Sequence, residues 1–296
     1  MRSCVLTRLG LIAFVSLSAC TARRVDPNDH SMHEVSPASV GNAAVQQAQG
    51  LPAGAGDVAG RLLKSPRHAE WTMIRSGNDS IRAWVVYPER KTKAPVVVVI
   101  HEIFGLSAWI RGVADQLAAD GFIAIAPDLL TGKAPLEGDS LAAATARQLI
   151  STLKADDVQR QLAIIGKYGM SLPAAQPRYG VVGFCWGGGT SFQHAVRSPD
   201  GLGASVVYYG TSPQTADLTN VKVPVLGLYG GNDARVDATI PPADSAMKAM
   251  GKSYSPNIFE GAGHGFLRAQ DQPANLAATE KAWPLTVTFF RKNLEK

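Results

Sequence analysis

The fold class of this chain can be inferred from the run Val181-Val182-Gly183-Phe184-Cys185-Trp186-Gly187-Gly188-Gly189. Its apolar first part ends in a G-x-C-x-G turn, after which a helix is expected. A sharp turn of this kind between a strand and a helix presents its central side chain to solvent. Gly183 and Gly187 flank Cys185 because a Cβ at either place would crowd the turn. Cys185 is therefore a candidate nucleophile, and the alternative is a small buried structural cysteine.

Two later turns supply an acid and a histidine. Asp233 closes the turn Gly230-Gly231-Asn232-Asp233, and His264 lies in Gly261-Ala262-Gly263-His264-Gly265-Phe266. A cysteine needs help to form its thiolate, a histidine exchanges protons near neutral pH, and an aspartate orients the imidazole. Asp237 is a rival to Asp233 as the acid.

The predicted elements alternate between strands and helices. Continuous β-branched runs such as Pro95–Ile100 are typical of strands buried on both faces of a sheet. The alternation predicts an α/β fold, with a mostly parallel sheet covered by helices on both faces. Each candidate residue follows a strand, so all three are expected to meet at the carboxyl edge of the sheet. The chain order of nucleophile, acid and histidine is that of the α/β-hydrolase fold. Further expected strands are Trp71–Ile74, Ile81–Tyr87, Phe122–Pro127, Tyr179–Phe184, Ala204–Tyr209, Val223–Tyr229 and Ser255–Phe259, and expected helices are Trp109–Asp120, Ser140–Gly169 with a break near Ala155, Gly188–Arg197, Pro241–Met250 and Leu276–Asn293.

Four motifs in the same order resemble those of the dienelactone hydrolases (carboxymethylenebutenolidases). They are His101-Glu102-Ile103-Phe104-Gly105, the run from Gly121 to Leu129, the turn around Cys185, and the turn around His264. The resemblance covers roughly residues 68 to 294. It implies an enzyme that hydrolyses a cyclic enol ester through a Cys185-His264-Asp233 triad and an acyl-cysteine intermediate. It implies neither a metal nor an organic cofactor.

The resemblance also assigns roles that spacing alone does not. It implies that Glu102 pairs with the resting thiol and accepts its proton when substrate binds. It implies that the backbone N–H groups of Ile103 and Trp186 form the oxyanion hole. Trp186 follows the nucleophile directly, as such a hole requires. His101 is assigned no chemistry.

The expected substrate-binding charges match the family only in part. Family members bind the carboxylate of the substrate with two arginines, and Arg268 matches one of them. The segment Leu130-Thr131-Gly132-Lys133 lacks the other, and Lys133 could supply only a point charge in place of a planar fork. We therefore expect weaker selection for anionic lactones. The alternatives are a broad carboxylesterase, a thioesterase, and a non-catalytic ligand-binding lipoprotein of the envelope.

The N-terminus resembles an export signal. Arg2 and Arg8 precede an apolar run, and Leu17-Ser18-Ala19-Cys20 resembles the bacterial lipoprotein box. The run is shorter than the ~20 residues that a spanning helix needs. The pattern predicts a signal peptide over 1–19, a lipidated Cys20 with a flexible tether over 20–67, and a hydrolase domain over 68–296. The expected location is the bacterial cell envelope, facing the periplasm or the exterior.

Composition places the chain among globular proteins. Of its 296 residues, 46% are hydrophobic and 18% are charged. The net charge of +5 is not gathered into a long Lys/Arg run, which argues against nucleic-acid binding. The expected partners are a small-molecule ester or lactone and, through the lipid, a membrane. We expect a monomer.

Overall fold

The computed structural model describes residues 50–295, which contain an eight-stranded sheet of order β1-β2-β4-β3-β5-β6-β7-β8. β3 to β8 run parallel, while β1 and β2 form an antiparallel extension. The predicted α/β-hydrolase fold is confirmed. The strands are β1 (Ala69–Ser76), β2 (Asp79–Val86), β3 (Ala94–Ile100), β4 (Ile123–Pro127), β5 (Ala175–Phe184), β6 (Leu202–Tyr208), β7 (Val225–Gly230) and β8 (Tyr254–Phe259).

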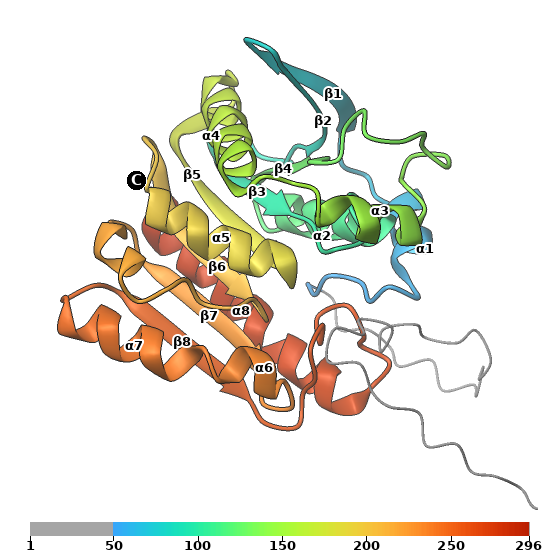
Figure 1. The fold of residues 1–296 in the computed structure, drawn as a ribbon. Helices are drawn as coiled ribbons and strands as arrows, with labels where there is room; N and C mark the ends of the chain where they lie inside the picture. The colour runs from blue at the N-terminus through green and yellow to red at the C-terminus, as the bar shows by residue number, and fades with distance from the viewer. Residues whose placement is uncertain (1–49, 296) are drawn as a thin grey trace, which may run out of the picture. The chain divides into compact units, whose positions relative to one another are not determined.

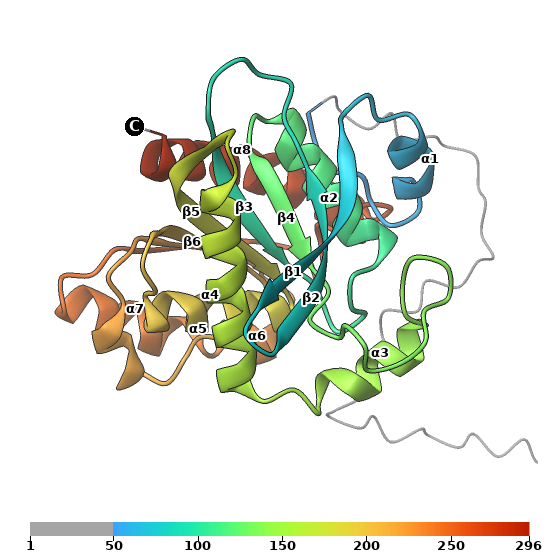
Figure 2. The same ribbon diagram turned by 90° about the horizontal axis from the view of Figure 1, so that it is seen from above.

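Helices cover both faces of this sheet (Figures 1 and 2). They are α1 (Val58–Leu63), α2 (Ala108–Ala119), α3 (Ala143–Ile150), α4 (Ala155–Ser171), α5 (Trp186–Arg197), α6 (Ala234–Asp237), α7 (Ile240–Ala249) and α8 (Pro273–Leu294), with a short 3-10 helix η2 (Asp217–Asn220).

The alternation of side chains along β3 divides the core into two layers. Val97 and Val99 pack with α2 and α8, whereas Val96 and Val98 pack with α4. Successive residues of a strand point to opposite faces, so a strand covered on both sides must be apolar throughout. All seven residues of β3 are buried accordingly. The long helix predicted from Ser140 is divided into α3 and α4, with the break just before Ala155 as expected.

The expected tether over 20–67 is corrected in its C-terminal part. Residues 51–63, here called the N-terminal strap, pack against the domain, with Leu51 5% and Val58 4% exposed. The backbone of the strap is held as well, because Trp109 Nε1 donates to the Ala53 carbonyl at 3.1 Å and Gln270 Nε2 donates to the Pro52 carbonyl at 3.0 Å. The packed domain therefore begins before His68.

The signal peptide and Cys20 lie outside the described residues. Within residues 50–295, none of the helices combines the length and the apolar character needed to cross a bilayer.

Candidate active site

Cys185 occupies a strained turn between β5 and α5. Its φ of 56° and ψ of −116° are rare for a residue with a side chain, and its backbone N–H donates to the Tyr208 carbonyl at 3.1 Å. The predicted need for glycine is met, since a Cβ on Gly183 would lie 1.8 Å from the carbonyl oxygen of Gly187. The turn thus holds the half-buried thiol at the carboxyl end of β5.

His264 connects Cys185 with Asp233. Its Nδ1–H donates to the Asp233 carboxylate, and it also hydrogen-bonds the Cys185 thiol. Burial lowers the pKa of His264, but the hydrogen bonds to Asp233 and Cys185 outweigh burial and raise it to about 10. The three residues come from the ends of β5, β7 and β8. His264 thus lies between Cys185 and Asp233, and the catalytic roles of the three residues remain predictions.

Asp237 does not take the place of Asp233. It lies on α6, one turn beyond Asp233, and its pKa is raised by burial and by the charge of Asp233. The carboxylate that contacts the imidazole is that of Asp233, which is 8% exposed. The geometry therefore favours Asp233 as the acid.

Glu102 is buried directly beside the triad. Only 3% of the residue is exposed, and its Oε2 lies 3.4 Å from Nε of Arg268. Burial raises the pKa of Glu102 to about 7, although the positive charges of Arg268 and His264 oppose the shift. This carboxyl group therefore changes charge near neutral pH.

Ile103 and Trp186 lie against one apolar cluster, formed by Leu130, Leu141, Ala146 and Ile150. Trp186 is the first residue of α5, so its N–H has no acceptor within the helix. Its side chain stacks on the His101 ring, whose Nδ1–H donates to the Glu102 carbonyl at 2.8 Å. Burial lowers the pKa of His101, which favours the neutral imidazole. The oxyanion-hole roles of the two N–H groups remain predictions.

A second arginine reaches the site from α3. The guanidinium Cζ of Arg268 lies 4.7 Å from the centroid of the Phe104 ring, and that of Arg147 lies 4.9 Å from the same centroid. The Nε atoms of both arginines are buried without a hydrogen-bond partner within residues 50–295. Arg147 was not among the predicted site residues, because nothing in a helical segment indicates that it folds back over Phe104.

The family of the chain follows from comparison with known proteins. The model of the dienelactone hydrolase family matches residues 81–294. The chain belongs to the dienelactone hydrolase family. It is accordingly a hydrolase of carboxylic esters or lactones.

Several relatives match nearly their full length. A protein of Saccharolobus solfataricus named "Putative carboxymethylenebutenolidase" is 30% identical over 250 residues, which cover 73% of this chain and 96% of that protein. A protein of the same name from Escherichia coli K12 is 29% identical, covering 84% of this chain and 97% of its own length. Among solved structures, a "Putative Dienelactone Hydrolase" of Klebsiella pneumoniae superposes with a TM-score of 0.68 at 25% identity, covering 76% of this chain and 99% of that chain.

Lys133 lies away from the candidate active site. It lines a groove of about 340 Å³ between the β1–β2 turn and the start of α4, together with Asp79, Lys154 and Arg160. Cys185, Asp233 and His264 are not among the described residues that line this groove. The second positive charge beside Phe104 is that of Arg147.

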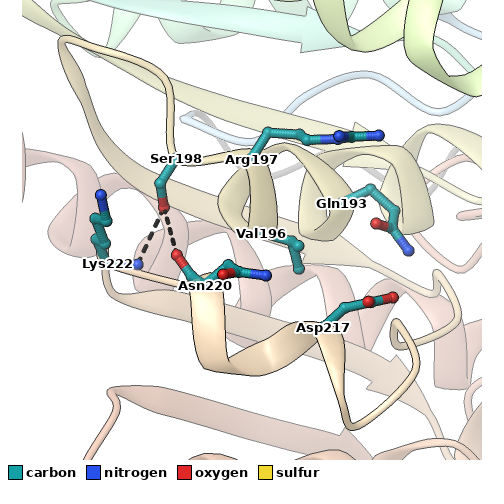
Figure 3. A pocket seen from close by; sticks show the side chains of 7 residues that line it. All are labelled: Gln193, Val196, Arg197, Ser198, Asp217, Asn220 and Lys222. Atoms are coloured by element: carbon teal, nitrogen blue, oxygen red, sulfur yellow. Dashed lines mark hydrogen bonds between the residues drawn. The ribbon is translucent and has the colours of Figure 1, made fainter.

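A second polar pocket, of about 390 Å³, lies at the far end of α5 from Cys185. Ser198 there is hydrogen-bonded to Asn220 and Lys222 (Figure 3). Its described lining contains no histidine, so we assign it no part in acyl transfer. Within residues 50–295, His, Cys, Asp and Glu form no group of three or more that could hold a metal ion.

Proposed function

We propose that the protein hydrolyses a small ester or lactone through an acyl intermediate on Cys185. The observation that carries this proposal is the position of His264, which is hydrogen-bonded to both Cys185 and Asp233. This arrangement stabilises a thiolate–imidazolium pair, because the charged imidazole is favoured by the carboxylate on one side and the sulfur on the other.

The reaction has two stages. In the first, the Cys185 thiolate attacks the carbonyl carbon, the oxyanion accepts hydrogen bonds from the N–H groups of Ile103 and Trp186, and His264 returns a proton to the leaving oxygen. In a lactone that oxygen stays attached to the acyl chain. In the second, His264 takes a proton from water, the resulting hydroxide attacks the thioester, and Cys185 leaves as the thiolate. The product is a carboxylic acid.

Glu102 is proposed to accept the proton of the resting thiol. A carboxyl group whose pKa is about 7 can exist in either charge state at neutral pH, so it can accept a proton without a large free-energy cost. Its burial beside Arg268 supports this role, because the positive charge of the arginine, 3.4 Å from Oε2, stabilises the ionised carboxylate.

The substrate is proposed to carry a carboxylate or a similar anion, in contrast to the weaker selection for anions that the sequence alone leads us to expect, because Arg147 supplies a second guanidinium. Arg147 and Arg268 flank one phenyl ring, and each offers a guanidinium fork that matches two acceptor oxygens. The one carboxylate paired with either in the described part of the chain is Glu102. The net positive charge left beside the thiol favours an anionic ester.

The test combines activity with detection of the intermediate. Cys185→Ala should abolish hydrolysis of an aryl ester while keeping the melting temperature, because the side chain points into the site. Mass spectrometry of the wild type mixed with a slow ester should find the acyl group on Cys185. Full activity of Cys185→Ala would place the active site elsewhere.

We also propose that the protein is a lipoprotein of the cell envelope, with its lipid on Cys20. The support is the sequence Leu17-Ser18-Ala19-Cys20 after an apolar run. Protein extracted from membranes should begin at Cys20 and carry a diacylglycerol-type mass addition, which Cys20→Ser should abolish. A soluble chain without lipid would rule this out.

A further inference from the structure

Tyr209 packs against His264 of the candidate active site and has a strained backbone conformation. It follows β6 with a φ of 38°, which a bulky aromatic residue rarely adopts. Its ring packs edge-on against His264, with centroids 5.2 Å apart, and against Phe266 at 5.4 Å. Its N–H donates to the Leu228 carbonyl at 2.9 Å, which fixes the backbone in this position. Strain of this kind persists only where the surroundings enforce it.

Two buried polar atoms beside the triad lack hydrogen bonds. Within residues 50–295, neither the hydroxyl oxygen of Tyr209 nor Oε2 of Glu102 has a hydrogen-bond partner, and both are closed to solvent. An unpaired buried donor and an unpaired buried acceptor are each unfavourable. A substrate in the site does not reach atoms that solvent does not reach. Each atom therefore requires a hydrogen-bond partner within the protein.

We propose that Tyr209 is a positioning residue for Glu102, whose ionised carboxylate accepts a hydrogen bond from the tyrosine hydroxyl through Oε2. The proposal rests on the proposed function, which gives Glu102 its part beside the thiol. A rotation of the Glu102 carboxyl group that brings Oε2 to the tyrosine hydroxyl would satisfy the unpaired donor and the unpaired acceptor together.

The electrostatics around the pair agree with this assignment. Burial, with the negative charges of Glu102 and Cys185, raises the pKa of Tyr209 well above its ordinary value, so the phenol stays a neutral donor. The charged groups that act on Glu102 are Arg268 and His264, from the segment after β8, and Glu102 in turn acts on Tyr209, which follows β6. Arg268 and His264 favour the carboxylate by charge. Tyr209 favours it by hydrogen bonding and thereby helps to set the pH at which Glu102 ionises.

The experiment is an infrared titration of the Glu102 carboxyl group in the full chain. The carboxylic acid band of Glu102 is the one that Glu102→Gln removes. In Tyr209→Phe the pKa of Glu102 should rise by about 1, because a hydrogen bond to the charged form is lost. Tyr208→Phe is the matched control, because this neighbouring buried hydroxyl pairs with Thr286 at 2.7 Å. An unchanged titration in Tyr209→Phe overturns the proposal, as does an equal change in Tyr208→Phe.

A second measurement uses the wild type, in case Tyr209→Phe does not fold. Crystals grown above pH 8 should show the Tyr209 hydroxyl within about 3 Å of a Glu102 carboxylate oxygen. A hydroxyl that pairs elsewhere at that pH overturns the proposal. Neither measurement depends on turnover. Activity that survives Cys185→Ala would therefore refute the proposed function alone, and an unchanged titration would refute the role of Tyr209 alone.

Discussion

At the scale of single residues, the buried carboxyl group of Glu102 links the site to stability. Its ordinary pKa is 4.5, and burial raises it to about 7 in the folded protein. As pH rises through this window, the unfolded chain releases the proton first, so the folded state binds more protons. The free energy of unfolding therefore falls between about pH 4.5 and pH 7.

Glu102→Gln should remove this loss, because an amide does not titrate. The difference in the free energy of unfolding between the variant and the wild type should increase, in favour of the variant, by up to about 3 kcal/mol from pH 4 to pH 8. Urea denaturation at the two pH values measures the difference. Glu260→Gln, at an exposed position, is the control and should show no such gain. A pH-independent difference for Glu102→Gln would contradict the charge-based explanation.

At the scale of elements, the N-terminal strap adds stability from outside the segment that the family model matches. Val58 is 4% exposed, and a Cβ on Gly112 of α2 would lie 2.2 Å from its Cγ2. Val58→Ala removes buried methyl groups, so we expect a loss of about 1.5 kcal/mol in the free energy of unfolding. Leu63→Ala, on the same helix at an 89% exposed position, should change it by little. Equal values for the two variants would show that the strap is only loosely attached.

The helix α3 carries the residue that we expect to select charge. Arg147→Gln should raise KM for an anionic ester about 10-fold and leave KM for a neutral ester of the same leaving group unchanged, because a charge-assisted hydrogen bond is lost. Lys133→Gln is the control and should affect both esters alike. The role of Arg147 is refuted by parallel changes in KM for the two esters.

Some elements can be predicted from the sequence and others cannot, for a physical reason. The strands around β3 and the turn at Cys185 follow from local rules, since burial on both faces demands apolar runs and the turn demands glycine. The strap was missed because its Gly- and Ala-rich sequence has no period. Its partners Trp109 and Gln270 lie 56 and 218 residues away from the carbonyls that they bind. Arg147 was also missed, because its partner Phe104 is likewise distant in the sequence.

At the scale of the whole molecule, the exposed apolar side chains favour a monomer. The large hydrophobic residues that are exposed within 50–295 are spread over separate helices, strands and loops: Leu63, Met73, Leu136, Met250, Ile258 and Leu285. The two edges of the sheet are β1 and β8, and Pro256 leaves β8 without one of the N–H groups that edge pairing requires. Sedimentation velocity should therefore give a single-chain species whose coefficient does not rise with concentration. A coefficient that rises with concentration would contradict this.

The strap also decides how the domain responds to mechanical force. Its Ala55 N–H donates at 2.9 Å to the carbonyl of Arg268, which lies in the loop between β8 and α8 that also carries His264. The strap precedes β1 in the chain. A pull on the chain from its N-terminal side is therefore transmitted to this loop before it loads any strand. The strap would detach by losing its hydrogen bonds and the packing of Leu51 and Val58, while the sheet stays intact. Catalysis would consequently be lost at a lower tension than the fold.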